Sequence, residues 1–202
     1  MSAVSEPGHP DPVGEFVDVM RRLRAECDWK RSQTHRTLAR YLLEETHEVL
    51  EALDTGDSDL LREELGDLLL QVVFHAVIAE EEGRFTLDDV AADVTAKMVR
   101  RNPHVFAPAG ESPDAATVTE QWEQIKAAEK QRTALDDGIP PTLPALLLAD
   151  KLLDRAERAG TPITTGSDGS IGERLLALVA EAREAGTDPE QALRDTVRSR
   201  LD

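Results

Sequence analysis

The segment from Asp59 to Glu82, DLLREELGDLLLQVVFHAVIAEEE, constrains the fold more than any other part of the chain. On a helix, at about 100° per residue, its apolar side chains cover nearly the whole circumference. These are Leu61, Leu65, Leu68, Leu69, Leu70, Val72, Val73, Phe74, Val77 and Ile78. A helix that is apolar on all sides belongs inside a bundle. The segment therefore predicts an all-α protein, a helical bundle built around this helix.

One narrow polar stripe runs along the same helix. It consists of Glu64, Asp67, Gln71 and His75, which recur at spacings of three or four residues and so share one face. Carboxylates that face a bundle interior must be neutral, paired with a cation or bound to metal. The residues four positions beyond Glu64 and Asp67 are Leu68 and Gln71, so no local base relieves either charge.

A second acidic motif, Glu44-Glu45-x-x-Glu48, lies on the preceding helix, which we expect over residues 37–53. Glu45 and Glu48 lie at one edge of the apolar stripe of that helix. The residues four positions beyond these three acids are Glu48, Val49 and Ala52, none of them basic. Like charges without a counter-ion cost free energy, and a divalent cation is the simplest group that removes the cost.

The two acidic helices are joined by a short turn at residues 54–58, which favours antiparallel packing. Such packing can bring together four carboxylates, those of Glu45, Glu48, Glu64 and Asp67. Ligation by carboxylate oxygens alone suits Mg²⁺, or Mn²⁺ in its place, rather than zinc. The alternative is a solvated acidic face with one buried salt bridge.

Charge and composition restrict the partners and the location. The net charge of −17 argues against binding to the phosphate backbone of nucleic acids, although a small anionic ligand remains possible beside a metal and local cations. No run of about 18 apolar residues exists, so no membrane span is expected. The N-terminus lacks the pattern of a signal peptide, and the single Cys27 fits a reducing compartment. We therefore expect a cytoplasmic protein.

The chain reads as a series of helices separated by Pro- and Gly-rich segments. Residues 1–12 are expected to be a disordered lead, residues 27–34 a loop and residues 103–116 a linker. A further linker is expected over 160–170. Besides the two acidic helices, helices are predicted over about 11–25, 86–101, 117–131 and 145–159, with a last one opening at Asp188-Pro189.

A weak internal repeat follows the second linker. Residues 171–179, IGERLLALV, echo residues 65–73, LGDLLLQVV. In this second copy Ser170 stands for Glu64 and Glu173 for Asp67, and no counterpart of the first acidic motif precedes it. We interpret residues 171–202 as a degenerate half-repeat without a metal site of its own.

Several blocks of the sequence resemble the MazG family of nucleoside triphosphate pyrophosphohydrolases. They are the two acidic motifs, the segment EELGDLLLQVVFHAVIAEEEGRF, RRNPHVF at 100–106 and WEQIKAAEK at 122–130. The resemblance covers residues 27–159 and implies a catalytic domain over about 13–159. It also implies an all-α dimer, or a higher homo-oligomer, that hydrolyses a nucleoside triphosphate to the monophosphate and pyrophosphate. The segment CDWK departs from the more usual CPWD of the family.

The resemblance also implies roles for individual residues. Glu45, Glu48, Glu64 and Asp67 are expected to be metal ligands, and Glu44 a further ligand or the base that orients water. Five cations are candidates for the triphosphate, although each could also be an ordinary surface residue: Lys97, Arg100, Arg101, Lys126 and Lys130. Trp29 and His35, in the segment before the first acidic helix, could contact the base.

Three functions remain open on the sequence alone. The first is an Mg²⁺-dependent pyrophosphohydrolase for (d)NTPs that cleans the nucleotide pool. The second is a narrower enzyme for pyrimidine dNTPs or phosphoribosyl-ATP. The third is a regulatory protein that binds nucleotides without turnover.

Overall fold

The computed structural model describes residues 11–106, 114–130, 134–166 and 169–201, and within these ranges all regular structure is helical. The all-α prediction is therefore confirmed. The chain divides into two compact units, residues 1–112 and 113–202, which are described separately below. The sequence placed the catalytic domain over 13–159, and that extent stays a prediction. Most of the expected lead, residues 1–10, lies outside the described residues.

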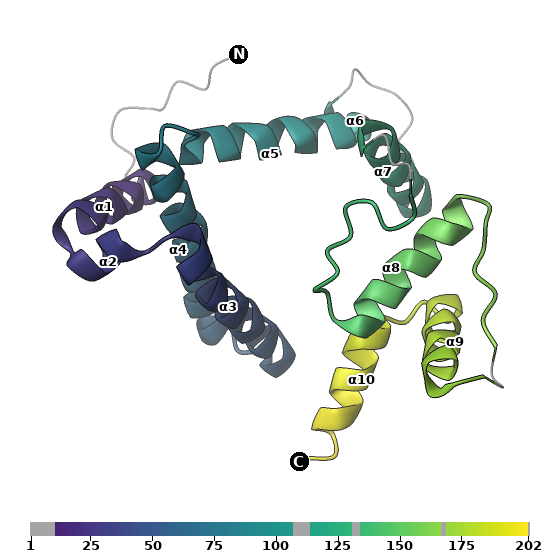
Figure 1. The fold of residues 1–202 in the computed structure, drawn as a ribbon. Coiled ribbons are helices and arrows are strands. Elements are labelled where there is room, and N and C mark those ends of the chain that lie inside the picture. Colours follow the sequence, from purple (N-terminus) through teal and green to yellow (C-terminus); the bar gives the residue numbers. More distant parts are fainter. Residues whose placement is uncertain (1–10, 107–113, 131–133, 167–168, 202) are drawn as a thin grey trace. The chain divides into compact units, whose positions relative to one another are not determined.

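The first unit contains six helices among its described residues (Figure 1). They are α1 (Pro12–Glu26), α2 (Asp28–Ser32), α3 (His35–Thr55), α4 (Ser58–Glu81), α5 (Leu87–Arg101) and α6 (Pro103–Phe106). Two predicted helix starts are confirmed. Asp11 caps α1 by accepting a hydrogen bond from the Gly14 amide, and Thr86 and Asp89 form a capping box at the start of α5.

Two predictions of irregular structure are wrong. Residues 27–34 contain the five-residue helix α2, and the expected linker at 103–116 contains α6 and the first residues of α7 (Ala115–Lys130). A helix of four or five residues is too short to show a periodic apolar face, so pattern analysis could not detect α2 or α6. Proline is compatible with the first turn of a helix, so Pro103 does not prevent α6 from starting there.

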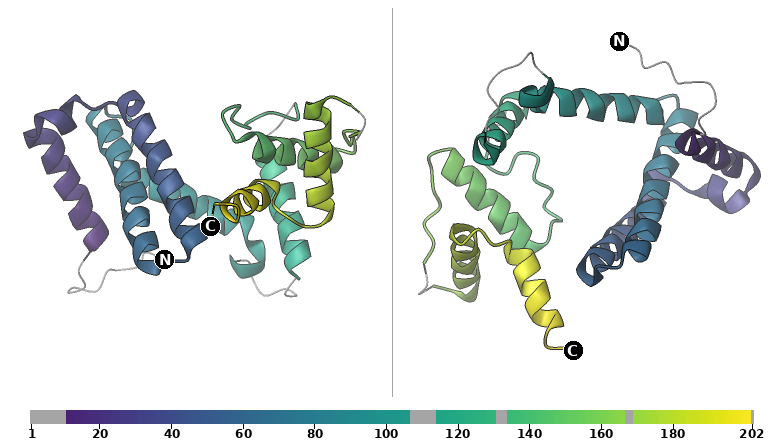
Figure 2. Two further views of the ribbon diagram at one scale, coloured as in Figure 1. Left: turned by 90° about the horizontal axis from the view of Figure 1, so that it is seen from below. Right: turned by 180° about the vertical axis from the view of Figure 1, so that it is seen from behind.

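Helices α3 and α4 form an antiparallel hairpin and lie side by side in Figures 1 and 2. Gly56 ends α3 with φ of 70°, a left-handed conformation that glycine adopts without strain. Asp57 then caps α4 by accepting hydrogen bonds from the amides of Asp59 and Leu60. The turn thus makes the two acidic helices neighbours, as the sequence predicts.

The core of the first unit lies where α1 and α3 pack against the C-terminal half of α4. Its buried members are Val17, Met20, Leu38, Val73, Phe74, Val77 and Ile78. The N-terminal half of α4 differs from the prediction of a helix buried all round, because Leu65, Leu69 and Val72 are 49, 39 and 40% exposed. Within one chain, the described residues leave this part of the apolar circumference uncovered.

Arg24 of α1 fixes the segment around α2. Its guanidinium is 7% exposed and pairs with the Glu81 carboxylate through Nε and Nη2. Its Nη1 donates to the main-chain carbonyls of Lys30, Arg31 and Gln33. One side chain therefore ties the end of α4 to the short segment that leads into α3.

The second unit contains α7 and three further helices, α8 (Ala145–Arg158), α9 (Ile171–Glu184) and α10 (Pro189–Arg198). The last three pack on one another, and Leu153, Ala156 and Val179 are buried there. Arg183 of α9 pairs with Asp150 of α8 at 2.7 Å. Among the described residues of the chain, no helix has the length and apolarity that crossing a bilayer requires.

Candidate metal centre

The face of α3 that meets α4 carries apolar residues at both ends and acids between them. Leu38 and Ala52 are each 1% exposed, and Tyr41, Glu45 and Glu48 lie between them at helical spacing. The apolar contact between the two helices is therefore interrupted in its middle. The sequence placed Glu45 and Glu48 at the edge of the apolar stripe, and the structure places them in line with it.

Three carboxylates converge at this interruption. One oxygen each from Glu45, Glu48 and Glu64 lies within 4.8 Å of the other two. Glu45 and Glu64 are half-buried, whereas Glu48 is exposed. Asp67 lies one turn beyond Glu64 on α4, and its charge raises the pKa of both Glu45 and Glu64. Glu44 is exposed on the same helix.

The electrostatics of the cluster favour a bound cation. Burial raises the pKa of Glu45, and its hydrogen bond with Glu48 and the charges of Asp67 and Glu48 raise it further. Burial likewise raises the pKa of Glu64, with the charges of Glu48, Glu63 and Asp67 adding to the effect. Among the described residues no Lys or Arg forms an ion pair with this cluster. Oxygen ligands of uncompensated charge fit a divalent ion such as Mg²⁺.

Gln71 and His75 continue the polar stripe of α4 beyond the acids. Gln71 is 4% exposed, and its Nε2 donates to Glu45 Oε1 at 3.3 Å. His75 lies one turn further, with its Nδ1 2.7 Å from the Nδ1 of His35 on α3. The Nε2 of His35 in turn contacts the guanidinium of Arg84 at 2.5 Å. The sequence does not predict these contacts, although the spacing of Gln71 and His75 places both on the acidic face.

The two residues expected to contact a base lie in different surroundings. Trp29 is 50% exposed on α2, and its ring meets that of Tyr41 edge-on at 6.2 Å between centroids. Tyr41 lies one turn before Glu45 on α3, which places Trp29 on the same side of the hairpin as the acids. His35 has both ring nitrogens engaged, by His75 and Arg84, so only its ring faces remain for a ligand.

The five candidate cations for a triphosphate are divided between the two units. Lys97, Arg100 and Arg101 lie in the last turns of α5, where Lys97 is half-buried, Arg100 exposed and Arg101 buried. Lys126 belongs to α7 in the second unit and pairs with Glu123 at 2.8 Å. The side chain of Lys130 lies outside the described residues.

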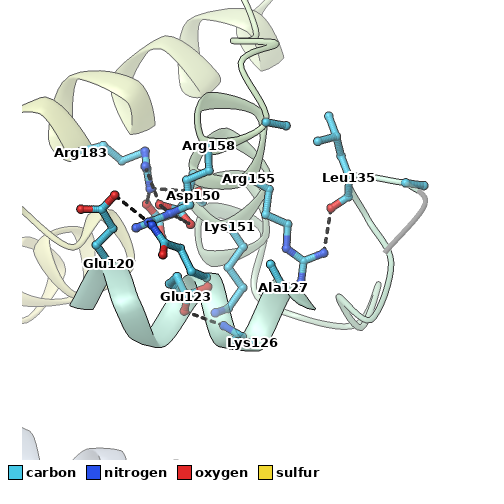
Figure 3. Close-up of a pocket in the computed structure, with 14 residues that line it drawn as sticks. Glu120, Glu123, Lys126, Ala127, Leu135, Asp150, Lys151, Arg155, Arg158 and Arg183 are labelled. Atoms are coloured by element: carbon cyan, nitrogen blue, oxygen red, sulfur yellow. Dashed lines mark hydrogen bonds and ion pairs between the residues drawn. The ribbon is translucent and has the colours of Figure 1, made fainter. Parts of the chain in front are cut away.

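Lys126 also lines a hollow of about 690 Å³ within the second unit. Figure 3 shows it beside side chains of both signs from α7, α8 and α9. Arg158 pairs with Asp154, and Arg155 donates to the main-chain carbonyls of Leu135 and Asp137. Most charges here are satisfied within the unit, in contrast to the acids between α3 and α4.

Comparison with known proteins identifies related sequences. The family model of the MazG nucleotide pyrophosphohydrolase domain matches residues 33–106, which include both acidic motifs. The nucleoside triphosphate pyrophosphohydrolase/pyrophosphatase MazG of Thermotoga maritima is 38% identical, over 91% of this chain and 80% of the relative. The nucleoside triphosphate pyrophosphohydrolase of Escherichia coli K12 is 43% identical, over 87% of this chain and 70% of the relative.

Further matches include the following two. A 26.1 kDa protein of Streptomyces cacaoi, named only for its position 3′ of blaB, is 44% identical over 93% of this chain and 81% of the relative. The crystal structure of a MazG-related protein from Thermotoga maritima covers 56% of this chain and 97% of its own, with 25% identity and a TM-score of 0.49.

Proposed function

Because this chain belongs to the MazG family of nucleotide pyrophosphohydrolases, we propose that it hydrolyses (d)NTPs to (d)NMPs and pyrophosphate in an Mg²⁺-dependent reaction. The observation that carries the proposal is the convergence of Glu45, Glu48 and Glu64 within 4.8 Å, without a basic partner among the described residues. Acids that only solvated the surface would have no reason to interrupt the contact between two packed helices.

In this proposal Glu45, Glu48, Glu64 and Asp67 hold the metal. A bound divalent ion supplies charge neutralisation for the phosphates and a lowered pKa for water. Release of pyrophosphate requires attack on the α-phosphorus, so water must be held in line with the leaving oxygen. Glu44 is the candidate to orient that water, because it neighbours Glu45 in sequence and is exposed to solvent.

We propose in addition that cations and an aromatic ring hold the substrate. Lys97, Arg100 and Arg101, in the last turns of α5, are the candidates for the triphosphate within the first unit. The role that the sequence predicted for Lys126 and Lys130 of α7 stays a prediction. Trp29 is the candidate to stack on the base because half of its surface is free. His35 contributes a ring face, since both of its nitrogens are engaged.

We further propose that the enzyme is a cytoplasmic homodimer, or a higher homo-oligomer, that removes unwanted nucleotides. The exposed Leu65, Leu69 and Val72 on α4 support self-association, because a single chain leaves them in contact with water. Sedimentation of a monomer at micromolar concentration would contradict this part of the proposal. The net charge of −17 supports a small-molecule substrate rather than nucleic acid.

The experiment that tests the reaction is product identification from a panel of NTPs and dNTPs with Mg²⁺, beside Asp67→Ala and EDTA controls. NMP with pyrophosphate, lost in both controls, is the expected result. Turnover confined to pyrimidine dNTPs or to phosphoribosyl-ATP would establish the narrower enzyme. Intact nucleotide after long incubation would favour a regulatory protein, and diphosphate with orthophosphate would refute attack at the α-phosphorus.

A further inference from the structure

Gln71 is a buried amide whose hydrogen bonding is incomplete. It is 4% exposed, near the core residues Val73 and Phe74 of the same helix. Its Nε2 donates to Glu45 Oε1 at 3.3 Å, whereas its own Oε1 is buried and has no hydrogen-bond donor among the described residues. A buried acceptor without a donor lowers stability, and an apolar side chain of similar size would avoid that cost. Packing therefore does not explain the amide.

The contact with Glu45 explains why an amide occupies this buried position. A carboxylate can only accept, so the Gln71 nitrogen must point at it, and this fixes which oxygen of Glu45 faces α4. The other oxygen is then left for the carboxylate cluster. A Lys or Arg in the same place would also donate, but its positive charge would oppose a cation bound to Glu45. A neutral donor orients the carboxylate without that competition.

We propose that Gln71 is a positioning residue of the metal centre, an inference that rests on the proposed function. It holds Glu45 Oε1 through its N–H and so presents Glu45 to the cation in one orientation. Groups that hydrogen-bond to metal ligands from outside the coordination sphere commonly control affinity in this way. Glu45 lies on α3 and Gln71 on α4, so the bond also helps to align the two helices and, with them, the two acidic motifs.

A purely structural role for Gln71 predicts a different pattern. If the amide served to join α3 and α4, replacing it would lower stability and leave metal affinity unchanged in the folded protein. If it positions Glu45, an apolar replacement would weaken metal binding. Stability without metal would stay the same or rise, because the orphaned acceptor is removed.

The test is titration of the metal-free full chain with Mn²⁺, with free Mn²⁺ followed by electron paramagnetic resonance. Gln71→Met, which keeps the volume and removes the donor, should raise the dissociation constant by roughly 10- to 100-fold. Gln124→Met is the matched control, because Gln124 Nε2 donates to Glu120 Oε1 at 3.2 Å on the exposed surface of α7. That control should bind Mn²⁺ as the parent does.

The outcomes separate this inference from the proposed function. Parental Mn²⁺ binding that is unchanged in folded Gln71→Met would overturn the positioning role and leave the metal centre intact. Failure of the parent to bind Mn²⁺ would overturn the metal centre and the role of Gln71 together. If Gln71→Met does not fold, Gln71→Asn withdraws the amide by one methylene and should weaken binding in the same direction. In activity assays, excess Mg²⁺ should restore kcat of the variant.

Discussion

The Nδ1 atoms of His35 and His75 lie 2.7 Å apart in parallel rings, and this contact links the start of α3 to the C-terminal half of α4. Only one of the two nitrogens can carry a proton. Since the guanidinium of Arg84 can only donate, His35 Nε2 is the acceptor and His35 Nδ1 donates to His75. A second proton on this pair, at His75 Nδ1, would remove the acceptor of the hydrogen bond from His35. It would also add a positive charge to a pair that already contacts Arg84.

The free energy of unfolding of the protein should therefore fall in mild acid, because His75 takes up a proton less readily in the folded state. Its pKa lies below the ordinary value of 6.5 because of burial and, to a lesser extent, the neighbouring His35. As the pH falls below 6.5 the unfolded chain takes up this proton first, so the folded state loses relative stability until the folded pKa is reached. Urea unfolding at several pH values between 7.5 and 5.5 should show this slope in the parent and a flatter one in His75→Gln. Identical slopes would refute the assignment.

Glu45→Gln should abolish activity and stabilise the metal-free protein. The pKa of Glu45 is raised in the folded state, so its contribution to stability declines as the pH rises above 4.5 and its full cost is present at pH 7.5. Removing one charge should raise the free energy of unfolding by roughly 0.2–0.5 kcal/mol for each like-charged neighbour. Urea unfolding in EDTA measures the change. The control Glu15→Gln, in the first turn of α1, should give no gain, and a loss in Glu45→Gln would contradict the repulsion.

Arg24→Lys should destabilise the first unit by about 1–3 kcal/mol. Lysine keeps the charge but cannot reach Glu81 and three main-chain carbonyls at once, so main-chain acceptors near α2 lose their donor. Thermal unfolding gives the magnitude, and hydrogen exchange of residues 28–33 should rise. Arg22→Lys is the control, because the partner of Arg22 among the described residues is the exposed Glu26 one turn away. Equal effects of the two substitutions would show that burial of Arg24 is unimportant.

Gly66→Ala tests the proposed dimer. Glycine inside a helix costs about 1 kcal/mol relative to alanine, and a Cβ at Gly66 would lie in open space among the described residues, apart from its own turn of α4. The substitution should therefore raise the stability of the isolated chain by about 0.5–1 kcal/mol. Gly66 lies one turn before the exposed Leu69, at the edge of the exposed apolar face of α4, so the added methyl should also weaken self-association in sedimentation. A more stable chain that associates as the parent does would place the interface elsewhere.

The sequence predicted what depends on spacing and missed what depends on distant partners. The helix class, the starts of α1 and α5, and the hairpin of α3 and α4 follow from local patterns, and the structure confirms them. Helix α2 was not predicted, because it is too short to show a periodic pattern and Arg24 holds it from another helix. The contact of His35 with His75 joins residues 40 positions apart, and no local pattern records such a pair.

The acids of α3 interrupt the apolar contact with α4, and the buried Leu38 and Ala52 lie at the two ends of this apolar seam. Folding alone would favour leucine or alanine at these positions, so the proposed metal ligands lie where they weaken the contact between α3 and α4. If these acids act in the proposed reaction, stability and activity favour different side chains at the same positions. Variants of this chain selected only for heat resistance should accumulate replacements at Glu45 and Glu48 before they alter the seam on either side.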